Sequence, residues 1–431
     1  MYNVFDYIFN KAVFMDGIIK NIIEDISGII KFDSSQKPAK ENAPFGAGAR
    51  GALDYFLSLA KSFGFKTHDY DGYAGEVIFG EGEEFAILAH LDVVPAGGGW
   101  TKEPFGGEID TVNKRVWGRG AMDDKGPAVI ALYCMKALKD EGFTPKRKIK
   151  LIVGCNEESG WACIDYYKAH AHMPDEGFSP DADFPVIYAE KGILQLKLKF
   201  DVEGDYSSLR GGERGNMVCD YCEATAPFDK EKLAQLGLAY DNGKIISRGK
   251  SAHGSTPELG INAIDPVLQY LGLHGVRDVL FGNRLGLTEL KDETGALTLS
   301  PNVIEGGKDC IFVTCDVRYP ATMTDLSVFK PIDAAGIEYE ILHAQKPLFN
   351  DRECFLIKTL CGVYNEVTGK NVKPIAIGGG TYARALKCGA AFGPEEEGEE
   401  NTIHQADEYI TFEKVERCFK IYKLAIERLT K

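Results

Sequence analysis

Residues Leu88 to Trp100 read LAHLDVVPAGGGW, and this stretch decides which kind of fold the chain adopts. It continues the apolar run EFAI, which is typical of a buried strand. Side chains two positions apart share one face of a strand, so His90 and Asp92 are expected side by side. A carboxylate beside an imidazole can orient it for a metal or a proton. An ordinary solvated polar pair at the end of a strand fits this fragment equally well.

The surrounding segments alternate between strand and helix patterns from about residue 51 to 189, which predicts an α/β sheet. After about residue 191, segments such as ILQLKLKFDVEG alternate apolar and polar residues, as half-exposed antiparallel strands do. The helix and strand pattern of the first part returns near Pro347. We therefore predict a discontinuous catalytic-type domain, residues 1–190 and 348–431, and an inserted α+β domain, residues 191–347, which is large enough to fold as a domain.

The composition and net charge of the chain limit the classes of function that the protein can have. With 431 residues, 44% hydrophobic and 26% charged, the chain has the make-up of a soluble globular protein of about two domains. The net charge of −15 argues against nucleic acid or an anionic membrane as the main partner. The eleven cysteines are scattered and odd in number, which favours reduced thiols in a cytoplasmic protein. The charged N-terminal segment resembles neither a signal peptide nor a membrane span, and an amphipathic helix is expected there.

Four further polar motifs lie where predicted strands end or loops begin. They are GAMDD (120–124), NEESG (156–160), PDADFP (180–185) and HQADE (404–408). Each has a structural explanation of its own: a helix N-cap for Asp123 and Asp124, an acid-rich helix start for Glu157 and Glu158, an ordinary turn around Asp181, and a structural histidine at His404. Taken together, histidine and carboxylate ligands without cysteine suit zinc, manganese or cobalt. Five such ligands with one bridging carboxylate would form a dinuclear site, with metals about 3.5–4 Å apart.

The order of these motifs resembles the dinuclear-zinc metallopeptidases that include aminoacylases, carboxypeptidase G and succinyl-diaminopimelate desuccinylase. The phrases PDADFPV and IGGGTYAR are similar to the dipeptidase V (PepV-type) branch in particular. The resemblance spans nearly the whole chain. It implies a zinc-exopeptidase-like catalytic domain with a mixed sheet, plus a lid domain, and a monomer in which the long lid replaces a dimer partner.

The resemblance also implies roles for individual residues. Two divalent metal ions are expected, zinc first, with manganese or cobalt as alternatives. The five implied ligands are His90 and Asp181 for one metal, Glu158 and His404 for the other, and Asp123 as the bridge. Asp92 would orient His90, and Glu157 would act as general base toward a metal-bridging water. The Asp123–Asp124 peptide bond is expected to be cis.

The remaining candidates lie in the inserted domain and in a glycine loop of the first domain. The motif RGKSAHGSTP (248–257) resembles the family's lid histidine motif, so His253 is expected to stabilise the oxyanion, although a loop histidine without a role fits the residues alone. Arg318 matches the lid arginine that receives a substrate carboxylate, and Asn216 matches a lid asparagine near it. Gly379 and Gly380 belong to a glycine loop that approaches substrate or simply forms a turn.

The resemblance therefore predicts a metal-dependent dipeptidase, a hydrolase that cleaves the peptide bond of free dipeptides. Two alternatives remain open. One is an N-acyl amino acid amidohydrolase of the aminoacylase or desuccinylase type. The other is a metal-binding module without catalysis, against which the intact Glu157 argues.

Overall fold

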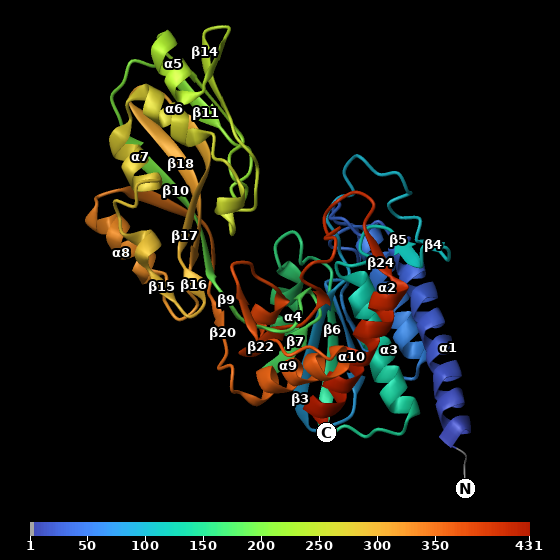
Figure 1. The fold of residues 1–431 in the computed structure, drawn as a ribbon. Helices are drawn as coiled ribbons and strands as arrows, with labels where there is room; N and C mark the ends of the chain where they lie inside the picture. The colour runs from blue at the N-terminus through green and yellow to red at the C-terminus, as the bar shows by residue number, and fades with distance from the viewer. Residues whose placement is uncertain (1–3) are drawn as a thin grey trace. The chain divides into compact units, whose positions relative to one another are not determined.

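The computed structural model describes residues 4–431, with side chains from residue 17 onward, and the chain forms two compact units. Unit 1 comprises Met1–Tyr188, Asn350–Ile375 and Thr381–Lys431, and unit 2 comprises Ala189–Phe349 and Ala376–Gly380. The ribbon in Figure 1 follows the chain through both units. No helix among residues 4–431 is long and apolar enough to cross a membrane.

Unit 1 is built on a mixed sheet with strand order β1-β2-β6-β3-β7-β22-β9. The strands are β1 (Lys66–Tyr70), β2 (Ala74–Phe79), β6 (Arg147–Gly154), β3 (Glu83–His90), β7 (Glu176–Ser179), β22 (Cys388–Ala391) and β9 (Ile187–Glu190). The four central strands β6, β3, β7 and β22 run parallel, and their neighbours on both sides pair antiparallel. The sheet confirms the predicted α/β class and its mixed character. The end of β9 also pairs with β20 (Leu348–Phe349) and β21 (Ile375–Ile377).

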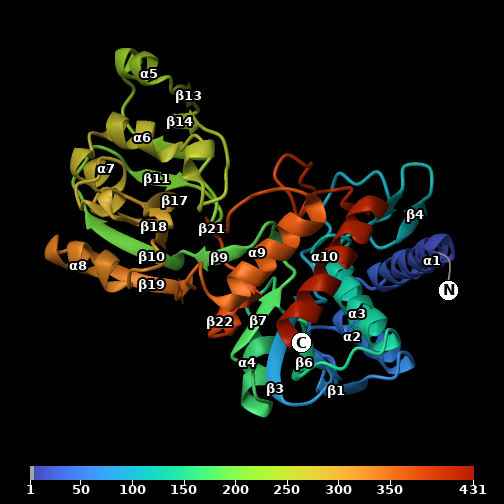
Figure 2. The ribbon, with the colours of Figure 1, turned by 60° about the horizontal axis from the view of Figure 1, so that its bottom comes forward.

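Helices surround this sheet. They are α1 (Val4–Ile30), α2 (Ala47–Ser62), α3 (Lys125–Asp140), α4 (Ala162–His170), α9 (Phe355–Thr368) and α10 (Phe412–Thr430). Helix α1 packs against α2, α3 and α10. Helices α9, α10 and α3 lie side by side over the sheet (Figure 2). Helix α3 is buried along almost its whole length, as expected for a helix packed between other elements. A small sheet of β4 (Glu108–Asp110), β5 (Arg115–Trp117) and β24 (Tyr409–Thr411) and the pair β8 (Ala182–Asp183) and β23 (Pro394–Glu395) complete the unit.

Unit 2 contains an antiparallel sheet with strand order β13-β14-β12-β11-β17-β18-β10-β19. The strands are β13 (Ala239–Asp241), β14 (Lys244–Arg248), β12 (Tyr221–Thr225), β11 (Ser208–Gly211), β17 (Thr298–Gly306), β18 (Cys310–Tyr319), β10 (Gly192–Asp201) and β19 (Glu338–Gln345). Leu194, Leu196 and Leu198 of β10 are buried and alternate with more exposed neighbours, which is the pattern that predicted these strands. The remaining α-helices and strands are α5 (Lys230–Leu236), α6 (Ile264–Leu271), α7 (His274–Leu280), α8 (Leu326–Ala334), β15 (Lys291–Asp292) and β16 (Gly295–Ala296).

Two sequence expectations differ from the structure. The segment GINAIDPVLQYLGLHG (260–275) has the apolar pattern of one helix, but it forms α6 and the start of α7, because Gly272 takes a left-handed conformation (φ 74°) that ends α6. The segment Ala376–Gly380 groups with unit 2, whereas the sequence pattern assigned it to the first domain. Its contacts with unit 2 include the hydrogen bond that the Arg318 guanidinium donates to the carbonyl oxygen of Gly378.

Candidate metal centre

The candidate ligands of unit 1 gather because three parallel strands end at the same edge of the sheet. His90 is the last residue of β3, Glu157 and Glu158 follow β6, and Asp181 follows β7. The carboxyl ends of parallel strands are where α/β sheets place their functional side chains. Asp123 enters from the loop before α3, and His404 from the loop before β24. The topology thus brings together motifs that lie more than 300 residues apart in sequence.

Asp123 stands between the two histidines. Its Oδ1 lies 3.0 Å from Nε2 of His90, and its Oδ2 lies 2.9 Å from Nε2 of His404. Each carboxylate oxygen therefore faces a different imidazole. This is the arrangement expected of a carboxylate that contributes one oxygen to each of two neighbouring cations.

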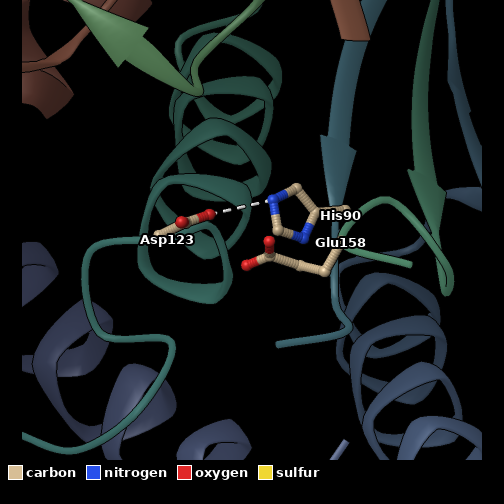
Figure 3. Close-up of side chains that lie close together, drawn as sticks. All are labelled: His90, Asp123 and Glu158. Carbon is tan, nitrogen blue, oxygen red and sulfur yellow. Dashed lines mark ion pairs between the residues drawn. The ribbon is translucent and has the colours of Figure 1, made fainter. Parts of the chain in front are cut away.

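The other two carboxylates complete the cluster. Glu158 Oε1 lies 3.0 Å from Nε2 of His404, and Asp181 Oδ2 lies 3.6 Å from Nε2 of His90. Ligand atoms of His90, Asp123 and Glu158 lie within 4.8 Å of one another, and Figure 3 shows these three side chains pointing toward a common point. The His404 side chain is 49% exposed, whereas that of His90 is 1% exposed, so solvent reaches the cluster from the His404 side.

The charges in the cluster favour bound cations. Burial, together with the charge of Asp123, raises the pKa of Asp181 to about 7. Burial and neighbouring carboxylates also raise the pKa of Glu157 far above its usual value. Burial opposes ionisation of Asp123 too, but the neighbouring imidazoles of His404 and His90 lower its pKa. Divalent cations would relieve the repulsion among these carboxylates.

The His90 side chain provides a further test of whether a metal fits. Its buried Nε2 lies near Asp123 but outside hydrogen-bond geometry, while its Nδ1 lies 3.0 Å from the backbone oxygen of Asp92. A neutral histidine that donates from Nδ1 keeps a lone pair on Nε2, which is the form that binds metals. The residues of this cluster therefore fit a metal centre.

Asp92 lies beside His90 but holds a different part of the site with its carboxylate. Its Oδ1 is 3.6 Å from Nδ1 of His90, longer than the contact made by its own backbone oxygen. The two carboxylate oxygens instead accept hydrogen bonds from the backbone N–H groups of Glu157 (2.9 Å) and Glu158 (3.0 Å). Asp92 thus connects the end of β3 to the loop after β6. His90 and Asp92 are both buried and lie in contact. The explanation of these two residues as an ordinary solvated polar pair is therefore wrong.

Asp124 occupies the N-cap position of α3 without capping the helix through its side chain. Its Oδ2 accepts a hydrogen bond of 3.1 Å from the backbone N–H of His90. The peptide bond between Asp123 and Asp124 is cis, as the resemblance predicted. The explanation of this aspartate pair as a simple helix cap is therefore wrong.

Sequence reasoning gave no role to Glu408 and Arg119, which form a buried ion pair of 2.7 Å next to the cluster. Glu408 Oε1 also accepts hydrogen bonds from the backbone N–H groups of Gly120 (3.1 Å), Met122 (2.9 Å) and Asp123 (3.3 Å). Glu408 thereby connects the loop that carries Asp123 to the loop before β24, which carries His404 and Glu408 itself. The final glutamate of that motif was the only available sequence signal.

Unit 2 holds a second polar cluster, which contains the candidates of the inserted domain. The Arg318 guanidinium donates to both carboxylate oxygens of Asp316 and, at 3.0 Å, to the carbonyl oxygen of Gly378. These bonds use three of its five N–H groups and leave one on each Nη atom. Arg318 is 5% exposed and Asp316 is fully buried, so the Asp316 carboxylate holds the guanidinium in one orientation.

His253 and Asn216 lie on adjacent segments of the same unit. His253 pairs with Met217 in an isolated β-bridge, and the Gly254 N–H donates to the carbonyl oxygen of Asn216 at 2.7 Å. Nδ1 of His253 lies 2.7 Å from the hydroxyl oxygen of Ser255. Gly378 packs close to Ser255, so a Cβ at Gly378 would lie 3.2 Å from that side chain. Gly379 and Gly380 follow directly in the same segment. The roles of these residues toward a substrate stay predictions.

Comparisons with known proteins agree with this fold. The solved structure of human carnosine dipeptidase 1 has a TM-score of 0.60 at 12% identity, covering 97% of both chains. The di-peptidase Dug1p from Saccharomyces cerevisiae has a TM-score of 0.59 at 14% identity, covering 96% of this chain and 97% of that one. At such identities the likeness concerns the fold alone.

Sequence relatives are much closer. The Beta-Ala-Xaa dipeptidase of Lactobacillus delbrueckii subsp. lactis is 35% identical over 454 residues, which cover 95% of this chain and 96% of that protein. The family model for "Peptidase family M20/M25/M40" matches residues 86–428. The chain therefore belongs to peptidase family M20/M25/M40.

Proposed function

We propose that this protein is a metal-dependent dipeptidase that hydrolyses the peptide bond of free dipeptides. The observation that carries the proposal is Asp123, whose two carboxylate oxygens face His90 and His404 separately at 3.0 and 2.9 Å, in a buried cluster of carboxylates. Similarity over nearly the full length to a protein named Beta-Ala-Xaa dipeptidase supports the substrate class. We also propose that the protein is a monomer and that it is located in the cytoplasm.

The five ligands divide into two sets around Asp123. His90 and Asp181 would hold one divalent cation, Glu158 and His404 would hold the other, and Asp123 would contact both. Zinc is the first choice, with manganese or cobalt as alternatives, because imidazole and carboxylate ligands serve all three. Such ions polarise a carbonyl group and lower the pKa of a water molecule.

Glu157 would act as the general base. Its backbone is fixed by the Asp92 carboxylate, so its side chain extends from an anchored loop next to the ligand Glu158. It would accept a proton from the attacking water and later donate a proton to the leaving amine. The pKa of Glu157 is raised by burial and by neighbouring carboxylates, and cations in the cluster would lower it toward the range of a working base.

Residues of unit 2 would bind the rest of the substrate. The two remaining N–H groups of Arg318 suit the C-terminal carboxylate of a dipeptide, with Asn216 and the segment of Gly379 and Gly380 contributing beside it. His253 would stabilise the developing oxyanion. A receptor of this kind favours substrates that end in a free carboxylate.

A hydrolysis panel on chelated protein tests the proposal. Zinc, manganese or cobalt is added back, and cleavage is compared for β-alanyl-histidine, other dipeptides, tripeptides and N-acetyl amino acids. We expect cleavage of dipeptides only, lost on chelation and restored by at least one metal. Cleavage of N-acetyl amino acids in preference would identify an amidohydrolase. Metal binding without any hydrolysis would identify a binding module.

Replacing Arg318 by methionine is expected to lower kcat/KM for dipeptides about 10-fold to 100-fold, mainly through KM. The paired hydrogen bonds to the substrate carboxylate would be lost together, and a net contribution of roughly 1.5–3 kcal/mol for this charge-assisted contact corresponds to the expected loss. The measurement compares free dipeptides with the same dipeptides amidated at the C-terminus.

The amidated substrates are the internal control, because they lack the charge that Arg318 would bind. Their slower hydrolysis is expected to change less than about twofold relative to the parent enzyme. Arg284→Met alters an exposed arginine of the same unit that lies outside the candidate segments, and serves as the matched variant. Equal losses for free and amidated substrates would show that Arg318 acts only on the folding of unit 2.

A further inference from the structure

Trp161 contacts the proposed base directly. Its indole Nε1–H donates a hydrogen bond of 3.1 Å to Oε1 of Glu157. The two residues are four positions apart in the loop between β6 and α4, which is closed by a bond from the Trp161 N–H to the carbonyl oxygen of Asn156 (2.8 Å). The Asn156 side chain closes the loop further by accepting from the N–H of Ala162 (3.1 Å). The loop therefore presents the indole N–H to the carboxylate from a fixed backbone.

The backbone of Trp161 has an unfavourable conformation for its residue type. Its φ of 66° and ψ of 13° lie in the left-handed region, where a bulky side chain is uncommon. Such a conformation costs of the order of 1–3 kcal/mol and persists only where surrounding contacts hold it. A glycine would remove this cost but also the indole. A tryptophan at this strained position therefore points to a role for the indole side chain itself.

Aromatic packing holds the indole ring in place. Trp161 packs edge-on against Tyr382, with ring centroids 5.1 Å apart and an interplanar angle of 83°. Tyr382 is fully buried, its hydroxyl lies 2.7 Å from Sγ of Cys163, and its ring lies edge-on to His90 at 5.9 Å. The ring that orients Trp161 thus also borders a candidate metal ligand, which fixes the indole relative to the cluster.

We propose that Trp161 is a positioning residue for Glu157, and this inference rests on the proposed function. The Asp92 carboxylate anchors the Glu157 backbone, and the indole N–H holds Oε1 of its side chain. Oε2 is then the oxygen directed to accept the proton. Without the indole N–H, the carboxylate rotates among several orientations, and only a fraction of them reach the water.

The alternative role for Trp161 is purely structural, as an aromatic residue that fills space beside Tyr382. Phenylalanine distinguishes the two roles, because it retains an aromatic ring at the position and lacks the N–H donor. Trp117→Phe makes the same chemical change in β5, where the indole packs against Tyr409 at 4.9 Å. It therefore serves as the matched control.

The kinetic experiment uses metal-loaded full-length protein and compares Trp161→Phe with Trp117→Phe. We expect Trp161→Phe to lower kcat about 10-fold to 100-fold, with KM changed less than about twofold and metal content unchanged. In the Glu157→Ala background the same substitution is expected to leave the residual rate unchanged, because the indole then has no carboxylate to orient. Equal losses of kcat in both backgrounds, or a kcat unchanged by Trp161→Phe, would overturn the proposal.

A second measurement tests the hydrogen bond without using hydrolysis. In protein labelled with ¹⁵N at the indoles, the three tryptophan signals are assigned by the phenylalanine variants. We expect Glu157→Ala to shift the Trp161 indole proton upfield and to leave the Trp117 signal in place. An unmoved Trp161 signal would overturn the inference. If the wild-type protein hydrolyses no dipeptide, the proposed function fails, and with it the catalytic role of Trp161, even where the indole signal shows that the bond exists.

Discussion

Replacing Glu157 by alanine is expected to lower kcat/KM for dipeptides by about 100-fold to 10,000-fold, the range that a general base contributes. The loss is expected almost entirely in kcat, because Glu157 acts on the proton of the attacking water and not on substrate binding. The variant should fold normally and bind metal, since its side chain is not among the five candidate ligands. The measurement combines steady-state kinetics, metal content and thermal unfolding.

Two variants make the result specific. Glu157→Gln keeps the size of the side chain and can still accept the indole hydrogen bond of Trp161, but it cannot take up a proton, so its loss should match that of alanine. Glu397→Ala removes an exposed glutamate from the acidic loop of the same unit and is expected to leave kcat/KM unchanged. Activity of Glu157→Ala within about threefold of the parent enzyme would assign the proton transfer to another group.

The fold and the cluster could be predicted because their signals are local in sequence. Buried parallel strands appear as short apolar runs, and β3, β6 and β7 are each followed by a polar motif. Since parallel strands end at one edge of a sheet, motifs that are far apart in sequence are expected to meet there. By this reasoning His90, Glu157 and Glu158 share the edge, whereas only the resemblance predicted a place for Asp181, because the residues EGFS of β7 are not an apolar run.

The contacts that support the cluster could not be predicted, because they depend on partners without a periodic pattern. The Asp92 carboxylate lies beside His90 as expected, but its hydrogen bonds to the backbone of the loop after β6 could not be predicted, because a backbone N–H carries no sequence signal. The indole of Trp161 reaches Glu157 only because that loop has a left-handed turn at the tryptophan. The segment Ala376–Gly380 groups with unit 2 for a similar reason, since its carbonyl groups accept hydrogen bonds from the Arg318 guanidinium and from the Lys191 backbone N–H.

Replacing Glu408 by alanine is expected to destabilise unit 1 by about 3–5 kcal/mol. The variant leaves the Arg119 guanidinium buried without its carboxylate partner, and removing one member of a buried ion pair has a cost of this size. It also leaves the buried N–H groups of Gly120 and Met122 without their acceptor. The free energy of unfolding, measured by urea titration with and without metal, gives the effect.

The double variant Arg119→Met/Glu408→Met separates the ion pair from the positioning of the loops. Removing both charges should recover much of the lost stability, because no unpaired charge remains buried. Metal affinity should stay reduced in both variants, because the loops that carry Asp123 and His404 are no longer joined by a common carboxylate. If the double variant binds metal as tightly as the parent protein, Glu408 contributes stability alone. A single variant within about 1 kcal/mol of the parent would show that other contacts satisfy Arg119 and the loop amides.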